Sequence, residues 1–196
     1  MSKFRRKLTI RVNAGFYIVL AFAFVTISLK WIAAWFLAAA VHELGHVIAV
    51  AASGHKVYAL NISWLGAQIC TDYLGNDEWY CTLAGPIFGF LLIYTARYTP
   101  VLALCAIIQS LVNLLPFYPL DGGRAVRGIA RNLWGEENAI KISRVASVAV
   151  IIIIAVMVYK IEDDIMSVVL ISVLIINGLK MLLRKIPCKR RGKWVQ

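Results

Sequence analysis

Long apolar runs constrain this chain more than any other feature of its sequence. Hydrophobic residues make up 61% of the 196 residues and charged residues only 16%, proportions outside those of an ordinary soluble domain. A helix needs about 20 apolar residues to cross the roughly 30 Å of hydrocarbon in a bilayer, and several runs approach or exceed that length. The sequence therefore predicts a polytopic membrane protein, with about six spans at 13–29, 31–52, 79–96, 100–117, 145–160 and 165–183.

The spans and their short connections account for nearly the whole length. We therefore expect an all-α fold in a single membrane-embedded domain, 1–196, with a core at about 13–130, two further spans within 145–183 and a basic tail at 184–196. The first two spans cannot be one helix, because 12–52 would extend about 61 Å at 1.5 Å per residue. A tight turn near Ser28 is expected to separate them.

The basic residues predict which way the chain crosses the membrane. With both termini in the cytoplasm, 18 of the 21 lysines and arginines fall on the cytoplasmic side, and only Lys30, Arg97 and Lys160 fall outside. The net charge of +11 is then explained by contact of the two basic ends with anionic lipid headgroups, so no nucleic-acid partner is expected.

A chemical motif interrupts the second apolar run. His42-Glu43-Leu44-Gly45-His46 places two imidazoles four residues apart, on one face of a helix, where both can bind one divalent ion. Glu43 follows the first histidine and can act as a base toward water without binding the metal itself. Three ionisable groups in one turn of a membrane helix are costly as mere packing. The motif therefore predicts a metal site.

A catalytic zinc usually takes three protein ligands and leaves one position open for water. Asp121 stands out as the third ligand because Pro116 and Pro119 break the fourth span just before it and Gly122 and Gly123 free the backbone after it. Irregular backbone at membrane depth is tolerated only against protein or a wet cavity. The candidates considered, buried or at a span end, are His55, Asp72, Asp77, Glu78 and Asp121.

Two further segments suggest parts of the site. Asn113 lies one turn before Pro116 and is a candidate for an oxyanion or substrate contact, or alternatively for an ordinary hydrogen bond between helices. The loop 55–70 alternates polar and apolar residues, which predicts a small cytoplasmic β-hairpin or sheet between the second and third spans. Its open edge could bind substrate by strand addition, or the hairpin could simply cover the core.

Small residues in the third span have a simpler explanation. Ala84-Gly85-Pro86 permits close approach of a neighbouring helix and a kink, and plain packing is the favoured interpretation. The four cysteines show no CxxC spacing, so Cys81, at the entrance of the same span, is interpreted as a small apolar filler.

The motifs together resemble those of the site-2 protease family of intramembrane zinc metalloproteases (peptidase family M50). The resemblance pairs the H-E-L-G-H turn with N-x-x-P-x-x-P-L-D-G-G at 113–123 and covers about 13–130. It implies one Zn²⁺ per chain bound by His42, His46 and Asp121, with Glu43 as the catalytic base. The branch that processes a sporulation pro-sigma factor is the most similar, although the C-terminal CBS domain typical of that branch is not expected here.

The resulting hypothesis is an intramembrane endopeptidase of a bacterial cell membrane. Its expected substrate is a membrane protein or membrane-associated proprotein, cut near the cytoplasmic leaflet, and an inhibitory or regulatory membrane partner is possible. The alternative is a membrane protein that binds or transports metal ions without proteolysis. That alternative is less favoured, because the spans are nearly free of charge apart from this cluster. A catalytically silent binding partner is a third possibility.

Overall fold

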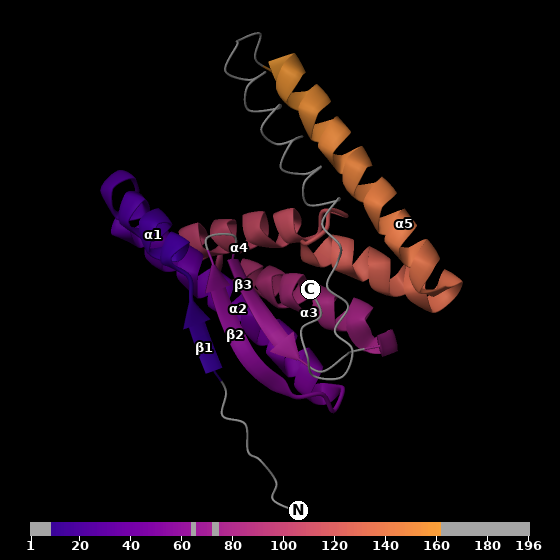
Figure 1. Ribbon diagram of the computed structural model, residues 1–196. Helices are drawn as coiled ribbons and strands as arrows, with labels where there is room; N and C mark the ends of the chain where they lie inside the picture. Colours follow the sequence, from indigo (N-terminus) through magenta and orange to yellow (C-terminus); the bar gives the residue numbers. More distant parts are fainter. Residues whose placement is uncertain (1–8, 64–65, 72–74, 162–196) are drawn as a thin grey trace, which may run out of the picture. The chain divides into compact units, whose positions relative to one another are not determined.

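A computed structural model describes residues 9–63, 66–71 and 75–161 (Figure 1). The predicted sixth span, 165–183, and the basic tail, 184–196, lie outside these residues. The chain divides into two compact units, Met1–Leu114 and Leu115–Gln196. The prediction of one membrane domain stays a prediction.

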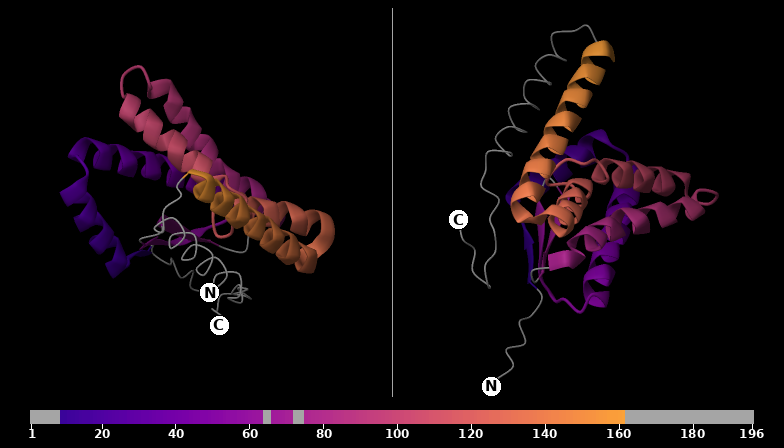
Figure 2. Two further views of the ribbon diagram at one scale, coloured as in Figure 1. Left: turned by 90° about the horizontal axis from the view of Figure 1, so that it is seen from above. Right: turned by 90° about the vertical axis from the view of Figure 1, so that its right-hand side faces the viewer.

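Four helices form most of the first unit. Their bounds are α1 Ala14–Thr26, α2 Leu29–Ala52, α3 Glu78–Leu91 and α4 Pro100–Asn113. The turn expected near Ser28 is confirmed, since Ser28 is the residue that precedes α2. Short 3₁₀ turns flank α3, at Gly75–Asp77 and Leu92–Thr95. α2 packs against both α3 and α4, and α3 and α4 lie side by side as a hairpin (Figure 2).

The first unit also holds a three-stranded sheet, which makes the prediction of an all-α fold with a hairpin incomplete. The expected hairpin is present as β2 Val57–Ser63 and β3 Gly66–Thr71, paired antiparallel. The additional strand, β1 Thr9–Val12, pairs parallel to β2 in the order β1-β2-β3. Four residues are too few to show a strand pattern, and pairing with the distant β2 gives them their conformation.

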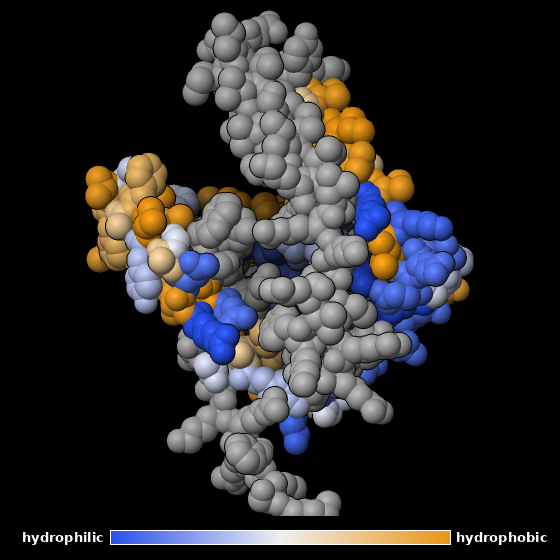
Figure 3. Space-filling model, in the orientation of Figure 1, coloured by the Kyte–Doolittle hydropathy of each residue, from blue (hydrophilic) through white to orange (hydrophobic). Residues whose placement is uncertain are grey.

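The distribution of small and large apolar side chains is the reverse of that in a soluble domain. The core cluster consists of small residues, namely Ala38, Cys105 and Ala106. Large hydrophobic side chains instead lie on the surface, and they gather visibly over α1 and over the distal part of α5 in Figure 3. Small residues at helix interfaces and large apolar residues outside are the pattern of helices packed in lipid. This is therefore a membrane protein.

The second unit is built on one long helical element, α5 Asp121–Ile161, which turns at Gly135. Gly135 has a positive φ of 80°, a conformation that favours glycine. Across this turn Glu136 forms ion pairs with Arg127 and Arg131. The predicted fifth span, 145–160, lies in the second segment of α5.

The six membrane spans are not confirmed as a set. Among the described residues, two helices are long and apolar enough to cross a membrane, Leu29–Ala52 and Asp121–Met157. Two more, Ala14–Thr26 and Pro100–Asn113, are apolar but shorter.

Candidate metal centre

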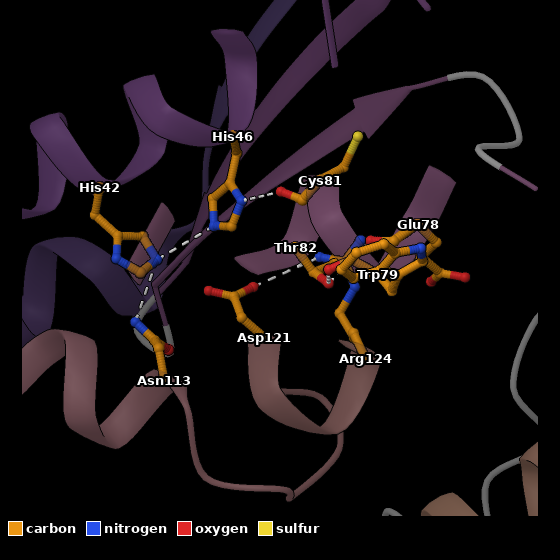
Figure 4. A network of polar contacts seen from close by, with 9 residues as sticks. All are labelled: His42, His46, Glu78, Trp79, Cys81, Thr82, Asn113, Asp121 and Arg124. Atoms are coloured by element: carbon orange, nitrogen blue, oxygen red, sulfur yellow. Dashed lines mark hydrogen bonds and ion pairs between the residues drawn. The ribbon is translucent and has the colours of Figure 1, made fainter. Parts of the chain in front are cut away.

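The two histidines of α2 face one another across a single turn. His42 and His46 are buried, with 4% and 9% of their surface exposed, and their Nε2 atoms lie 3.2 Å apart (Figure 4). Two nitrogen ligands of a tetrahedral zinc, each about 2.05 Å from the metal, are separated by about 3.3 Å. The spacing of the two Nε2 atoms therefore fits a shared metal ion.

The ring of His46 is held by a backbone carbonyl of α3. His46 Nδ1 lies 2.8 Å from the carbonyl oxygen of Cys81, and both residues are buried. Because a carbonyl only accepts, Nδ1 carries the proton and the lone pair of Nε2 points at His42. Metal-binding histidines are oriented by just such a partner on the second ring nitrogen.

Glycines make room for this arrangement between α2 and α3. A β-carbon on Gly85 would collide with the imidazoles of both His42 and His46, and one on Gly45 would meet the carbonyl oxygen of Ala84 at 2.6 Å. The close helix approach expected from Ala84-Gly85-Pro86 is thus confirmed. This close approach bears on the metal centre in particular, because Gly85 lies directly against the Nε2 atoms of His42 and His46.

Asn113 also reaches the histidine pair. It is the last residue of α4, and its Nδ2 lies 3.4 Å from His42 Nε2. The structure therefore brings together His42, His46 and Asn113. Glu43, half-buried, lies on α2 next to His42 in the same turn.

Asp121 lies in the second unit, where it is the first residue of α5. It is buried, and its Oδ1 lies 3.9 Å from Arg124 Nη1. The two glycines after it do not loosen the backbone, as the sequence suggested, but form the first helical turn. A β-carbon on Gly123 would meet the backbone of Phe117 and Tyr118, so close packing rather than flexibility explains this glycine.

Two of the other candidate ligands pair with each other. His55 Nε2 lies 3.4 Å from Asp77 Oδ2, with 24% and 38% of the side chains exposed, at the end of the unit where α2 ends and α3 begins. Glu78 opens α3, and Asp72 lies outside the described residues. This partly exposed contact connects the segment after α2 with the 3₁₀ turn before α3.

The contact between Cys81 and His46 was not predicted from the sequence. Its side chain is buried, with 2% exposed, in agreement with a small apolar filler. The atom that contacts His46 is its carbonyl oxygen, which every residue possesses. No residue-type signal could therefore have identified it.

Comparison with known proteins places this geometry in context. No protein-family model matches the sequence. The chain is 27% identical over 114 residues to a protein of Synechocystis sp. provisionally named a zinc metalloprotease, covering 50% of this chain and 30% of the relative. It is 26% identical over 123 residues to a zinc metalloprotease of Methanocaldococcus jannaschii, covering 55% of this chain and 36% of the relative. The matches thus span about a third of the length of these relatives.

A solved structure shares the fold. The site-2 protease from Methanocaldococcus jannaschii superposes with a TM-score of 0.64 at 20% sequence identity, and the match covers 98% of both chains. The 114 and 123 residues aligned in sequence cover only part of the chain, whereas the structural match extends over nearly all of it.

Proposed function

Because the chain belongs to the site-2 protease family of zinc metalloproteases, we propose that it is a zinc-dependent endopeptidase that cleaves a membrane protein or membrane-associated proprotein within or near the membrane. The observation that carries the proposal is the pair of buried Nε2 atoms 3.2 Å apart on α2. Two imidazoles oriented at one point, with a carboxylate in the same turn, suit metal-assisted hydrolysis.

We propose that His42, His46 and Asp121 bind the zinc. Each offers one ligand atom, two imidazole nitrogens and one carboxylate oxygen. This donor set, two histidines and one acidic residue, is typical of catalytic zinc sites that keep a fourth position open. The contact between His46 Nδ1 and the Cys81 carbonyl supports the assignment, since it leaves Nε2 available for the metal.

The proposed chemistry divides the work among the residues of this chain. When bound, zinc acts as a Lewis acid toward water and toward the substrate carbonyl. Glu43 accepts the proton of the attacking water and returns it to the leaving amine. Asn113, whose Nδ2 lies beside His42, is proposed to donate a hydrogen bond to the oxyanion or to the substrate backbone.

The depth of the motif supports cleavage near the cytoplasmic leaflet. His42 lies 13 residues after the start of α2, about 20 Å along a helix that is about 36 Å long at 1.5 Å per residue. With the N-terminus in the cytoplasm, α2 runs inward and places His42 in the cytoplasmic half. The sheet on that side is proposed to present an edge strand to the substrate, because a helical peptide bond is shielded by its own hydrogen bonds.

The test is the variant Glu43→Gln, produced together with a candidate membrane substrate. Zinc content of the purified protein, measured by elemental analysis, should stay close to one ion per chain while cleavage is lost. Glu137→Gln removes a carboxylate from an exposed position of α5 and serves as the matched control. Full cleavage by Glu43→Gln would refute the mechanism, and ion uptake into proteoliposomes without proteolysis would favour a metal transporter.

A further inference from the structure

His46 is oriented by a backbone atom, so its orientation depends on how the first turn of α3 lies on α2. The Cys81 carbonyl accepts from His46 Nδ1 at 2.8 Å. A side-chain partner could follow the imidazole by rotating, but a carbonyl moves only with its helix. A shift of α3 along α2 by a fraction of an ångström would therefore lengthen this bond and turn the ring of His46.

Ser53, the capping residue directly after α2, contacts that turn of α3 directly. Its Oγ donates to the carbonyl oxygen of Ala49 at 2.7 Å. The same oxygen lies 2.9 Å from the hydroxyl of Tyr80 and 3.4 Å from the thiol sulfur of Cys81. Because its only proton goes to Ala49, Ser53 Oγ is the acceptor for both groups of α3. One hydroxyl thus holds Tyr80 and Cys81 against the end of α2.

The spacing along α2 makes the two contacts parts of one seam. Ala49 follows His46 by three residues, and Ser53 follows it by seven. These spacings place the three residues on one face of the helix. On this face, His46 contacts the Cys81 carbonyl. Ser53, two turns further along, contacts the side chains of Tyr80 and Cys81. Thr82, by contrast, donates within α3 to the carbonyls of Glu78 and Trp79, so its hydroxyl does not connect the helices.

We infer that Ser53 is a positioning residue for the metal centre: through Tyr80 and Cys81 it fixes the register of α3 so that the Cys81 carbonyl orients His46. The inference rests on the proposed zinc site. Ser53 does not touch the metal or the substrate in this scheme. It acts through His46, and its loss should weaken metal binding without removing any ligand.

The experiment compares zinc affinity in the full chain, measured by competition with a chromogenic chelator. Ser53→Ala should weaken zinc binding about tenfold, the lower end of the 10–100-fold range seen when partners of metal-binding histidines are changed. The Co²⁺-substituted protein should show an altered visible absorption band, because the coordination geometry changes. Tyr80→Phe removes a single oxygen from the contact and should shift affinity in the same direction by about threefold.

Ser110→Ala is the matched control, since it makes the same change at a fully buried serine of α4, in a different helix contact. It should leave the zinc affinity and the Co²⁺ band unchanged. The inference is overturned if Ser53→Ala keeps wild-type affinity and spectrum, or if Ser110→Ala weakens binding equally. Failure of the wild-type chain to bind zinc would instead refute the proposed function, so the two failures are distinguishable.

Discussion

The seam between α2 and α3 and the helix α1 obey opposite packing rules. In the seam, Gly45 and Gly85 let side chains and backbone meet so closely that a single β-carbon would collide with a neighbour. In α1, none of the 13 residues is buried, and Val25 is 86% exposed. α1 meets α2 through an edge-to-face contact of Phe16 with Phe36. The seam carries the histidines, whereas α1 presents apolar surface.

This difference indicates at which positions the fold limits the size of the side chain. Within lipid, apolar side chains gain little by leaving the tails, so large hydrophobic residues do not drive helices together. Close contact of small residues and interhelical hydrogen bonds do, and both occur in the seam. We therefore expect additions of volume to be tolerated on α1 and to be damaging between α2 and α3.

The largest effect is expected for Gly85→Ala. Its β-carbon would occupy the space of the His46 and His42 imidazoles, so the two Nε2 atoms could not keep their 3.2 Å separation. Zinc affinity should fall by about 100-fold or more, as for the loss of a metal-orienting contact. Alanine is also a better helix former than glycine by about 1 kcal/mol, so a loss cannot be attributed to helix propensity. Wild-type zinc affinity in this variant would contradict the proposed packing around the metal site.

A smaller effect is expected for Gly45→Ala, which lies in the motif but points at α3 instead of the metal. The new β-carbon would meet the Ala84 carbonyl at 2.6 Å and Phe88 Cβ at 2.8 Å, so α3 would have to move. Overpacking of this kind costs about 1–3 kcal/mol in the free energy of unfolding, measured by denaturant titration in detergent. Leu44→Ala, at the exposed neighbouring position, is the control and should change that free energy by less than about 0.5 kcal/mol.

The contrast also explains what could be predicted from the sequence. Apolar runs have a period and a length, so the first four helices and the turn at Ser28 could be predicted. Strand β1 could not, because its four residues depend on pairing with a strand about 50 positions away. The glycines after Asp121 were assigned to flexible backbone, yet Gly123 is helical and closely packed. The sequence alone does not distinguish a glycine that bends the backbone from one that makes room for a neighbouring segment.

The candidate site likewise contains residues that could be predicted from the sequence and residues that could not. His42, Glu43, His46 and Asp121 were predicted from residue chemistry and motif, and their roles remain predictions. For Asn113 the sequence left two roles open, an oxyanion or substrate contact and an ordinary hydrogen bond between helices. Its contact with His42 on α2 is compatible with both, so its role stays a prediction. The Cys81 carbonyl and the hydroxyl of Ser53 were not predicted. Both act through position in space, and spatial position across two helices is not encoded by any local pattern.

The smallest effect is expected on α1, where a matched pair of valines tests the comparison directly. Val25→Ala removes two methyl groups at a position 86% exposed, and Val50→Ala removes the same groups from α2 at a position 3% exposed. Lipid or detergent fills the space left at Val25, so the free energy of unfolding should change by less than about 0.5 kcal/mol. The space left at Val50 is enclosed by protein, and its lost contacts should cost about 2 kcal/mol. Equal losses for the two variants would show that α1 packs as tightly as the seam, and the distinction between the two regions would fail.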